Sequence, residues 1–262
     1  LSELKTFKDT NFYNSTISFN CDEMSGYIKT DSCKYYNTKV VIEGNTIYRE
    51  FFKNSVFDDK SSLKTNDNVV INVLAFQNAI LPECTFKPSK IDSDAFDNCN
   101  TNNITLDLSV VQTISNKAID KKFKNELIFP DTPIKLEHNA IVYFLDRYTS
   151  DGVITIPENI TLNNRFLEGA DLTGITKVIV KGALYDVDYS GSDGTENIDL
   201  VLIDHNRTYG HGVGWKSVYY TGDDGGMTKR YYDNKTVGTI NAGKNEEIYI
   251  GSNVHADTIY YD

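Results

Sequence analysis

The sequence has few cysteines, few prolines, one tryptophan and no long apolar run. Its 262 residues include 4 Cys, 5 Pro and 1 Trp. Four cysteines are too few for a disulfide-dense small fold. No stretch reaches the roughly 18 consecutive apolar residues of a membrane-spanning helix, so we expect no membrane insertion. Hydrophobic residues make up 40% of the chain, which is too many for a disordered protein and enough to form a substantial core.

Basic residues are also scarce: 26 Lys and Arg stand against 37 Asp and Glu, a net charge of −11. Nucleic acids and anionic membrane surfaces require a basic surface, so the charge excludes both as the main partner. Tyr (17) and Phe (13) are abundant, and Asn makes up roughly a tenth of the chain. This composition favours strands and loops over long helices.

One pattern recurs along the chain: an aliphatic residue, three others, a small or aromatic residue, and a large apolar residue. Successive copies lie 20 to 26 residues apart, a period typical of stacked repeat proteins. A single unit of this length cannot bury its apolar face, so neighbouring units are expected to stack. The six copies are Ile47-x-x-x-Phe51-Phe52, Ile71-x-x-x-Ala75-Phe76, Ile91-x-x-x-Ala95-Phe96, Ile114-x-x-x-Ala118-Ile119, Leu136-x-x-x-Ala140-Ile141 and Leu162-x-x-x-Phe166-Leu167.

Short stretches of alternating apolar and polar residues accompany these copies and predict strands. Proline ends two of them, because it cannot donate to a strand ladder. We expect each unit to hold one strand, a turn and a return segment. The sequence therefore predicts an α+β or mainly β repeat solenoid of about eight short strands over residues 38–206. The expected strands include 104–108, 127–130, 153–157, 175–180 and 198–203.

The unit at 127–141, with its Pro130 and its Leu136-x-x-x-Ala140-Ile141 anchor, resembles the BspA-like (type 5) leucine-rich repeats of bacterial surface proteins. Those repeats read approximately I-x-I-P-x-x-V-x-x-I-x-x-x-A-F-x-x-C, and residues 91–99 match the second half, Cys99 included. The resemblance covers about two-thirds of the chain. It implies a right-handed, secreted or surface-displayed solenoid that binds other molecules and has no shared catalytic residues. Only one unit keeps the Cys, and later units lose the Ala-Phe pair.

The two ends are expected to cap the solenoid. Residues 1–37 form the predicted N-terminal cap, where a Cys21–Cys33 bridge would add stability; free thiols are the alternative, as for Cys84 and Cys99. The chain begins at Leu1 without a signal segment, so we expect a mature secreted form. Residues 207–262 are rich in Tyr and Gly and predict a β cap or a small β module. Its expected strands are a hairpin of 217–221 with 228–232, then 237–240 and 247–250.

Two clusters of polar residues suggest a metal site or a catalytic site. Asp186, Asp188 and Ser190 have the alternating oxygen ligands of a calcium loop, but the twelfth position is Asn197 instead of Glu; an acidic loop between repeats explains the same residues. Calcium is thus the one cofactor considered. Asp204, His205 and His211 would suit a metal site or an acid–base pair, and a hydrolase is one alternative function; a connecting loop is the other interpretation.

The outward side chains of the predicted strands form the expected binding surface, since a solenoid presents an extended sheet face. We therefore expect a secreted or cell-surface leucine-rich-repeat protein that mediates protein binding or adhesion and is not an enzyme. The alternative is carbohydrate binding through the Tyr-rich C-terminal region. The ligand and the oligomeric state stay open. The surface residues predicted by strand alternation are Thr105, Asp107, Thr155, Lys177 and Asp199, with Tyr219 and Tyr231 in the C-terminal region.

Overall fold

The computed structural model places the chain in two compact units, Leu1–Tyr143 and Phe144–Asp262. Below, these are called unit 1 and unit 2. The boundary falls inside the 38–206 stretch that the sequence analysis treated as one solenoid. The structure describes residues 6–21, 29–119, 123, 127, 130, 132–137, 139–162, 166–181, 194–203, 215–221, 228–232, 236–242, 246–250 and 254–261.

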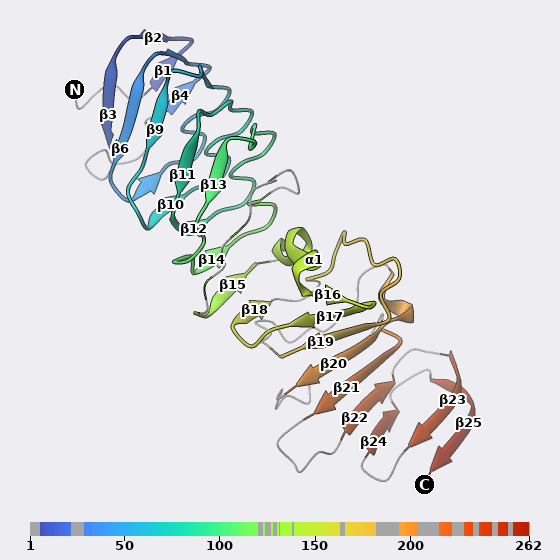
Figure 1. The fold of residues 1–262 in the computed structure, drawn as a ribbon. Helices are drawn as coiled ribbons and strands as arrows, with labels where there is room; N and C mark the ends of the chain where they lie inside the picture. Colours follow the sequence, from blue (N-terminus) through green and yellow to red (C-terminus); the bar gives the residue numbers. More distant parts are fainter. Residues whose placement is uncertain are drawn as a thin grey trace. The chain divides into compact units, whose positions relative to one another are not determined.

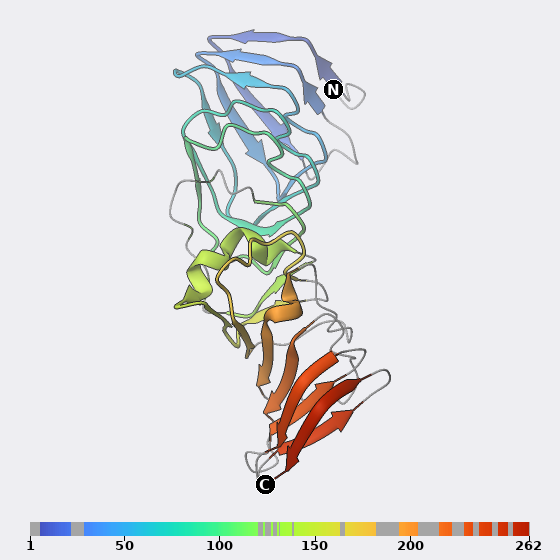
Figure 2. The same cartoon turned by 90° about the vertical axis from the view of Figure 1, so that its right-hand side faces the viewer.

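Unit 1 is a β-solenoid in which short parallel strands of successive coils lie side by side (Figures 1 and 2). The predicted repeat solenoid is therefore confirmed. The ladders are β1 (Thr6–Lys8) with β4 (Lys29–Asp31); β2 (Asn11–Tyr13), β5 (Lys34–Tyr36) and β8 (Val56–Phe57); β3 (Thr16–Asn20), β6 (Lys39–Glu43) and β9 (Ser62–Lys64); β11 (Cys84–Phe86) with β13 (Ile104–Leu106); and β7 (Thr46–Ile47), β10 (Val69–Ile71), β12 (Pro88–Ile91), β14 (Thr113–Ile114) and β15 (Ile134–Leu136).

Each copy of the sequence repeat corresponds to one turn of the coil, and equivalent residues of neighbouring copies pair with each other. Ile71 pairs with Ile47 on one side and with Ile91 on the other, and Ile114 pairs with both Ile91 and Leu136. All three anchor positions are buried in each of the six copies. The sequence pattern thus identified both the period of the coil and its core.

Aromatic anchors stack along the coil interior. Phe76 is fully buried. Its ring centroid lies 5.7 Å from that of Phe52 and 5.1 Å from that of Phe96, with interplanar angles of 5° and 15°. A second stack of Phe12, Tyr35 and Phe57 has centroid separations of 5.2 and 4.2 Å. Such offset ring pairs add stability beyond the area that they bury.

Asparagine takes many of the sharp corners between strands. Of the thirteen described non-glycine residues with positive φ, six are Asn, a residue that tolerates the left-handed region better than most. The backbone hydrogen bonds align Ser32, Asn54, Asn78 and Asn98 one coil apart, all with φ between 50 and 57°. The high Asn content of the sequence therefore has a structural cause.

Because of these corners, each coil of unit 1 contains more strands than expected. The sequence analysis expected one strand per unit, but β4, β5, β6 and β7 all belong to one coil. The coil also begins before residue 38. Thr16 already pairs with Lys39 in parallel, with the same 23-residue offset as the pairing of Thr6 with Lys29.

Unit 2 carries a sheet of mostly parallel strands beside short helical turns. Its sheet contains the predicted hairpin, since β21 and β22 pair antiparallel, and β21 itself pairs in parallel with β20. The sheet order is β16 (Thr149–Ser150), β17 (Val153–Ile156), β19 (Lys177–Val180), β20 (Asp199–Ile203), β21 (Ser217–Thr221), β22 (Thr228–Tyr232) and β24 (Glu246–Ile250). The other elements of unit 2 are α1 (Leu145–Tyr148), β18 (Ile160–Leu162), the parallel pair β23 (Thr236–Ala242) and β25 (His255–Tyr261), and a 3-10 helix at Thr195–Asn197. A further 3-10 helix, Ala140–Phe144, spans the boundary residue Tyr143.

Removing the central ring of the Phe52–Phe76–Phe96 stack tests the core. We expect Phe76→Ala to lower the free energy of unfolding by about 3–5 kcal/mol, because it leaves a cavity between two stacked rings. Tyr13→Ala, which removes an exposed ring, is expected to cost less than about 1 kcal/mol. Urea unfolding followed by circular dichroism measures both. Equal losses would contradict this description of the core.

A comparison of two glycine variants distinguishes the effect of backbone strain from that of steric contact. Gly152 and Gly169 have φ of 75° and 78°, but only a Cβ on Gly152 would meet an atom, the Gly174 carbonyl oxygen at 2.6 Å. Both alanine variants are strained by about 1–2 kcal/mol in the left-handed region. Gly152→Ala is expected to lower the melting temperature clearly further, because the Gly174 backbone must also shift. Indistinguishable melting temperatures would show that this contact is absent.

Candidate functional site

The surface residues predicted in unit 1 do face outward. Thr105 is exposed between the buried Ile104 and Leu106 of β13. Asp107 is half-buried, and its carboxylate accepts a hydrogen bond of 2.9 Å from the Ser109 backbone N–H. The pKa of Asp107 lies below its usual value, chiefly through a hydrogen bond from the Ser109 side chain and then through this backbone bond. Because Asp107 holds the local turn, Thr105 is the freer of the two for a partner.

In unit 2, alternation along β17, β19 and β20 separates an inner from an outer face. Ile154, Val178 and Leu200 are paired in register and buried. The predicted residues lie on the opposite face, where Lys177 is exposed and Asp199 is half-buried. The register chosen from the sequence therefore assigned these side chains to the correct face.

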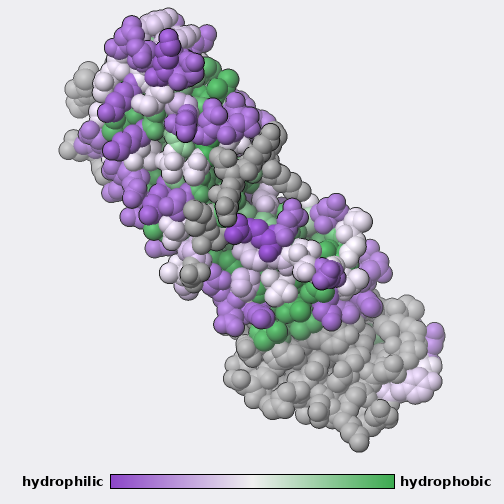
Figure 3. All heavy atoms as spheres, in the orientation of Figure 1, coloured by the Kyte–Doolittle hydropathy of each residue, from purple (hydrophilic) through white to green (hydrophobic). Residues whose placement is uncertain are grey.

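An aliphatic row crosses this outer face. Thr155, Ile179 and Val201 pair directly across the three parallel strands, and each remains partly exposed. The neighbouring row pairs Lys177 with Asp199, which carry opposite charges. Figure 3 shows hydrophobic residues at the surface of unit 2 beside hydrophilic ones. These five residues are called the unit 2 outer face below.

Asp199 is the most unusual group on this face. Its Oδ2 lies 3.8 Å from the Nζ of Lys216. Its Oδ1 is buried and has no hydrogen-bond partner within the described part of the chain. An unsatisfied buried carboxylate oxygen costs free energy.

The other candidate residues of unit 2 are only partly described. Tyr219 lies in β21 and Tyr231 in β22, both with strand backbone, but their side chains lie outside the described residues. The calcium candidates and the His cluster also lie outside them: Asp186, Asp188, Ser190, Asp204, His205 and His211. The chemistry suggested for these residues stays a prediction.

The Cys21–Cys33 bridge is not formed: all four cysteines are buried thiols. The two residues belong to different corners of the coil, since the Cys21 N–H donates to the Glu43 carbonyl and the Cys33 carbonyl accepts from Val56. Burial raises the pKa of the Cys33 thiol and that of Cys99, and raises the pKa of Cys84 to about 12. A raised pKa disfavours the reactive thiolate form of these three cysteines.

Mass spectrometry under non-reducing conditions checks this correction. We expect iodoacetamide in guanidinium chloride to alkylate all four cysteines without prior reduction. In native buffer at pH 8 the same reagent should react slowly, because burial blocks access and keeps the thiolate fraction small. If only two cysteines were alkylated before a reductant was added, the result would contradict this correction and support the Cys21–Cys33 bridge.

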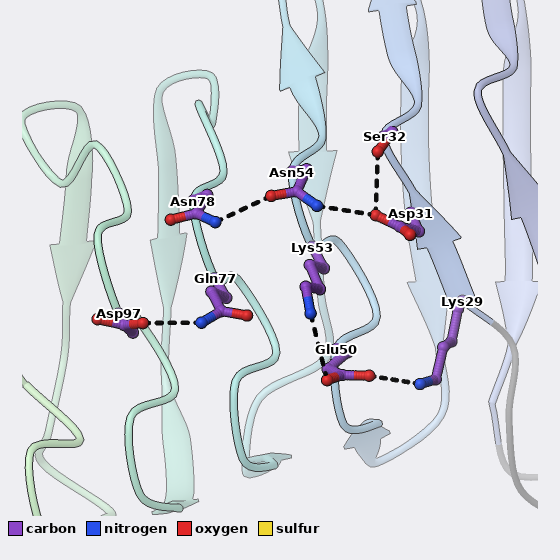
Figure 4. A network of polar contacts seen from close by, with 9 residues as sticks. All are labelled: Lys29, Asp31, Ser32, Glu50, Lys53, Asn54, Gln77, Asn78 and Asp97. Atoms are coloured by element: carbon purple, nitrogen blue, oxygen red, sulfur yellow. Dashed lines mark hydrogen bonds and ion pairs between the residues drawn. The ribbon is translucent and has the colours of Figure 1, made fainter.

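A polar network joins neighbouring coils of unit 1 (Figure 4). Lys29 Nζ lies 2.5 Å from Glu50 Oε2, and Lys53 Nζ lies 3.5 Å from Glu50 Oε1. The hydrogen bond from Lys29 is the first reason that the pKa of Glu50 is lowered. Amide groups extend the network, with Asn78 donating to Asn54 at 2.9 Å and Asn54 to Asp31 at 3.0 Å. Since its charged groups are paired, this network holds coils together and does not resemble a catalytic site.

One aromatic pair at the surface, an exposed Tyr13 beside a half-buried Tyr36, was not predicted from the sequence. Tyr13 on β2 and Tyr36 on β5 pair in register, with ring centroids 4.9 Å apart and planes 10° apart. Asn follows each Tyr, and Ser or Thr follows each Asn. This Tyr-Asn-Ser/Thr triplet at a spacing of 23 residues was the available signal.

The described residues contain no group of three or more His, Cys, Asp and Glu side chains placed to hold a metal ion. Among the same residues, no helix is long and apolar enough to cross a membrane. The fold and these surfaces define a β-solenoid with polar outer faces. No protein-family model, curated protein or solved structure matches the chain. The resemblance to BspA-like repeats therefore stays a prediction.

Proposed function

We propose that this protein is a non-catalytic binding protein, secreted or displayed at a cell surface, that adheres to a protein partner through the unit 2 outer face. The observation that carries the proposal is the partly exposed row of Ile179 and Val201 on a rigid parallel sheet. Outward positions of a solvated sheet face are normally polar, so this row is an exception.

The surroundings of this row suit a protein interface. Such interfaces combine an apolar centre with a polar rim, and here Lys177 and Asp199 border the two aliphatic side chains. The Asp199 carboxylate adds a negative charge that a cationic group of the partner would complement. Bonds to charged acceptors contribute more to specificity than those between neutral groups.

The scaffold supports recognition without a conformational change. The strands of this face are joined in a continuous parallel register, so their side chains are held in place before binding. Preorganisation of this kind reduces the ordering cost of association. The net charge of −11 favours a partner with basic groups over nucleic acid.

We also propose that the chain belongs to the leucine-rich-repeat proteins of the BspA-like type. The support is the Ile-x-x-x-Ala-Phe anchor, whose first and last positions are buried in every copy. The several short ladders of each unit 1 coil differ from the single strand per repeat that this family implies.

A surface-binding assay with matched variants tests the proposed function. The probes are fibronectin, laminin, fibrinogen and collagen, immobilised for biolayer interferometry. We expect the wild type to bind at least one of them, and Val201→Lys to weaken that binding by about tenfold or more, because it places a charge in the apolar centre.

Val41→Lys is the control, since Val41 is an equally half-buried outward valine on β6 of unit 1. It should retain wild-type binding. Equal loss in both variants would indicate a stability effect instead of a binding face. Hydrolysis of a glycan or peptide that His205→Ala abolishes would replace the proposal with an enzymatic function.

A further inference from the structure

We propose that the Tyr13–Tyr36 pair and the two asparagines beside it form a carbohydrate-binding site for pyranose units of an oligosaccharide. The site lies on the β2–β5 ladder of unit 1. It is separate from the unit 2 outer face, and the inference does not depend on the proposed function.

The exposure of the ring is the first observation. Tyr13 is 58% exposed, although its ring is as large as those of the buried stack one residue away. Phe12 and Tyr35, the adjacent residues in the same strands, point inward and stack at 5.2 Å. The core therefore does not need the Tyr13 ring. Tyr36 supports one side of it and leaves most of the ring accessible.

The amides beside the rings are the second observation. Asn37 Nδ2 donates to Asn14 Oδ1 at 2.8 Å. This bond leaves the Asn14 Nδ2 donor and the Asn37 Oδ1 acceptor without a partner in the described part of the chain. Both side chains are exposed. A donor and an acceptor thus sit next to each other at the edge of the aromatic pair.

The backbone fixes these groups in position. Asn14 and Asn37 have φ of 48° and 46°, and the Asn14 N–H donates to the Tyr36 carbonyl. The Asp58 carboxylate accepts the Asn37 N–H at 3.1 Å to each oxygen. With the backbone held in this way and the two amides bonded to each other, the side chains lose little entropy when a ligand binds.

This set of groups matches the chemistry of a sugar. A pyranose ring has an apolar face of C–H groups, which packs on an aromatic ring, and adjacent hydroxyls that both donate and accept hydrogen bonds. Tyr offers a large contact area at low entropic cost, and an adjacent amide donor and acceptor can engage two neighbouring hydroxyls. A hydrophobic peptide would require a concave apolar pocket, whereas this site is flat, exposed and bordered by amides.

The experiment uses a glycan array, followed by isothermal titration calorimetry with each oligosaccharide that binds. The array carries cello-, malto-, manno- and chito-oligosaccharides together with N-glycans, so that polysaccharide and glycoprotein sources are distinguished. We expect Tyr13→Ala to weaken binding by about tenfold or more, and Tyr13→Phe to retain it, because the ring carries the contact. Tyr260→Ala, which removes a 61% exposed tyrosine of unit 2, should have no effect.

A second pair of variants tests the amides without disturbing the corner. Asn14→Gly keeps a residue that accepts positive φ but removes the free donor, and is expected to weaken binding. Asn54→Gly removes an equivalent left-handed Asn that also accepts a bond from a neighbouring Asn, and should leave binding unchanged.

Three outcomes would overturn the proposal. The first is that no oligosaccharide binds the wild type. The second is that Tyr13→Ala and Tyr260→Ala weaken binding equally. The third is that a glycoprotein on the array binds as tightly after enzymatic deglycosylation, which would show peptide recognition. Because none of these variants changes the unit 2 outer face, loss of oligosaccharide binding would leave adhesion to the protein panel unaffected.

Discussion

The structure depends on one constraint: parallel backbone hydrogen bonds hold successive coils in a nearly constant register. Strands in such ladders lie about 4.8 Å apart, so each side chain stacks on its equivalent one coil away. This places Phe76 between Phe52 and Phe96, and the same register brings Tyr13 onto Tyr36. The stacked rings of the core and the stacked pair at the surface thus have the same cause. The register stacks equivalent rings of neighbouring coils, whether their side chains point inward or outward.

The same stacking restricts where charges can be placed, because like charges opposite each other in a sheet repel. Several equivalent charged residues accordingly face an opposite charge or an amide. Lys87 and Asp107 are one coil apart, and their charged groups lie 3.8 Å from each other. Gln77 donates to its equivalent Asp97 at 2.8 Å. Lys177 on β19 pairs with Asp199 on β20. At these positions, neighbouring coils stack without repulsion between like-charged side chains, although the chain is acidic overall.

The spacing of the Ile-x-x-x-Ala-Phe anchors was sufficient to predict the coil period and the core, and the alternation of apolar and polar residues predicted the outward face of β17, β19 and β20. The number of ladders per coil was not predictable, because left-handed corners occur at Asn and Asp but also at Leu74 and Lys117. The Cys21–Cys33 bridge failed for a related reason. Twelve residues of separation suggested a short loop, whereas Cys21 follows β3 and donates to the Glu43 carbonyl, and Cys33 lies between β4 and β5 and accepts from Val56.

The Tyr13–Tyr36 row ends where the register changes. In the next coil the residue equivalent to Tyr36 is Asp58, whose carboxylate takes the place of a backbone carbonyl and accepts the Asn37 N–H. The Ser61 hydroxyl similarly accepts the Thr38 N–H at 3.0 Å. The row has no third tyrosine, because Asp58 occupies that position. The aromatic surface is therefore two rungs long, which limits the proposed contact to one or two sugar units and favours recognition of a short motif over tracking along a polymer.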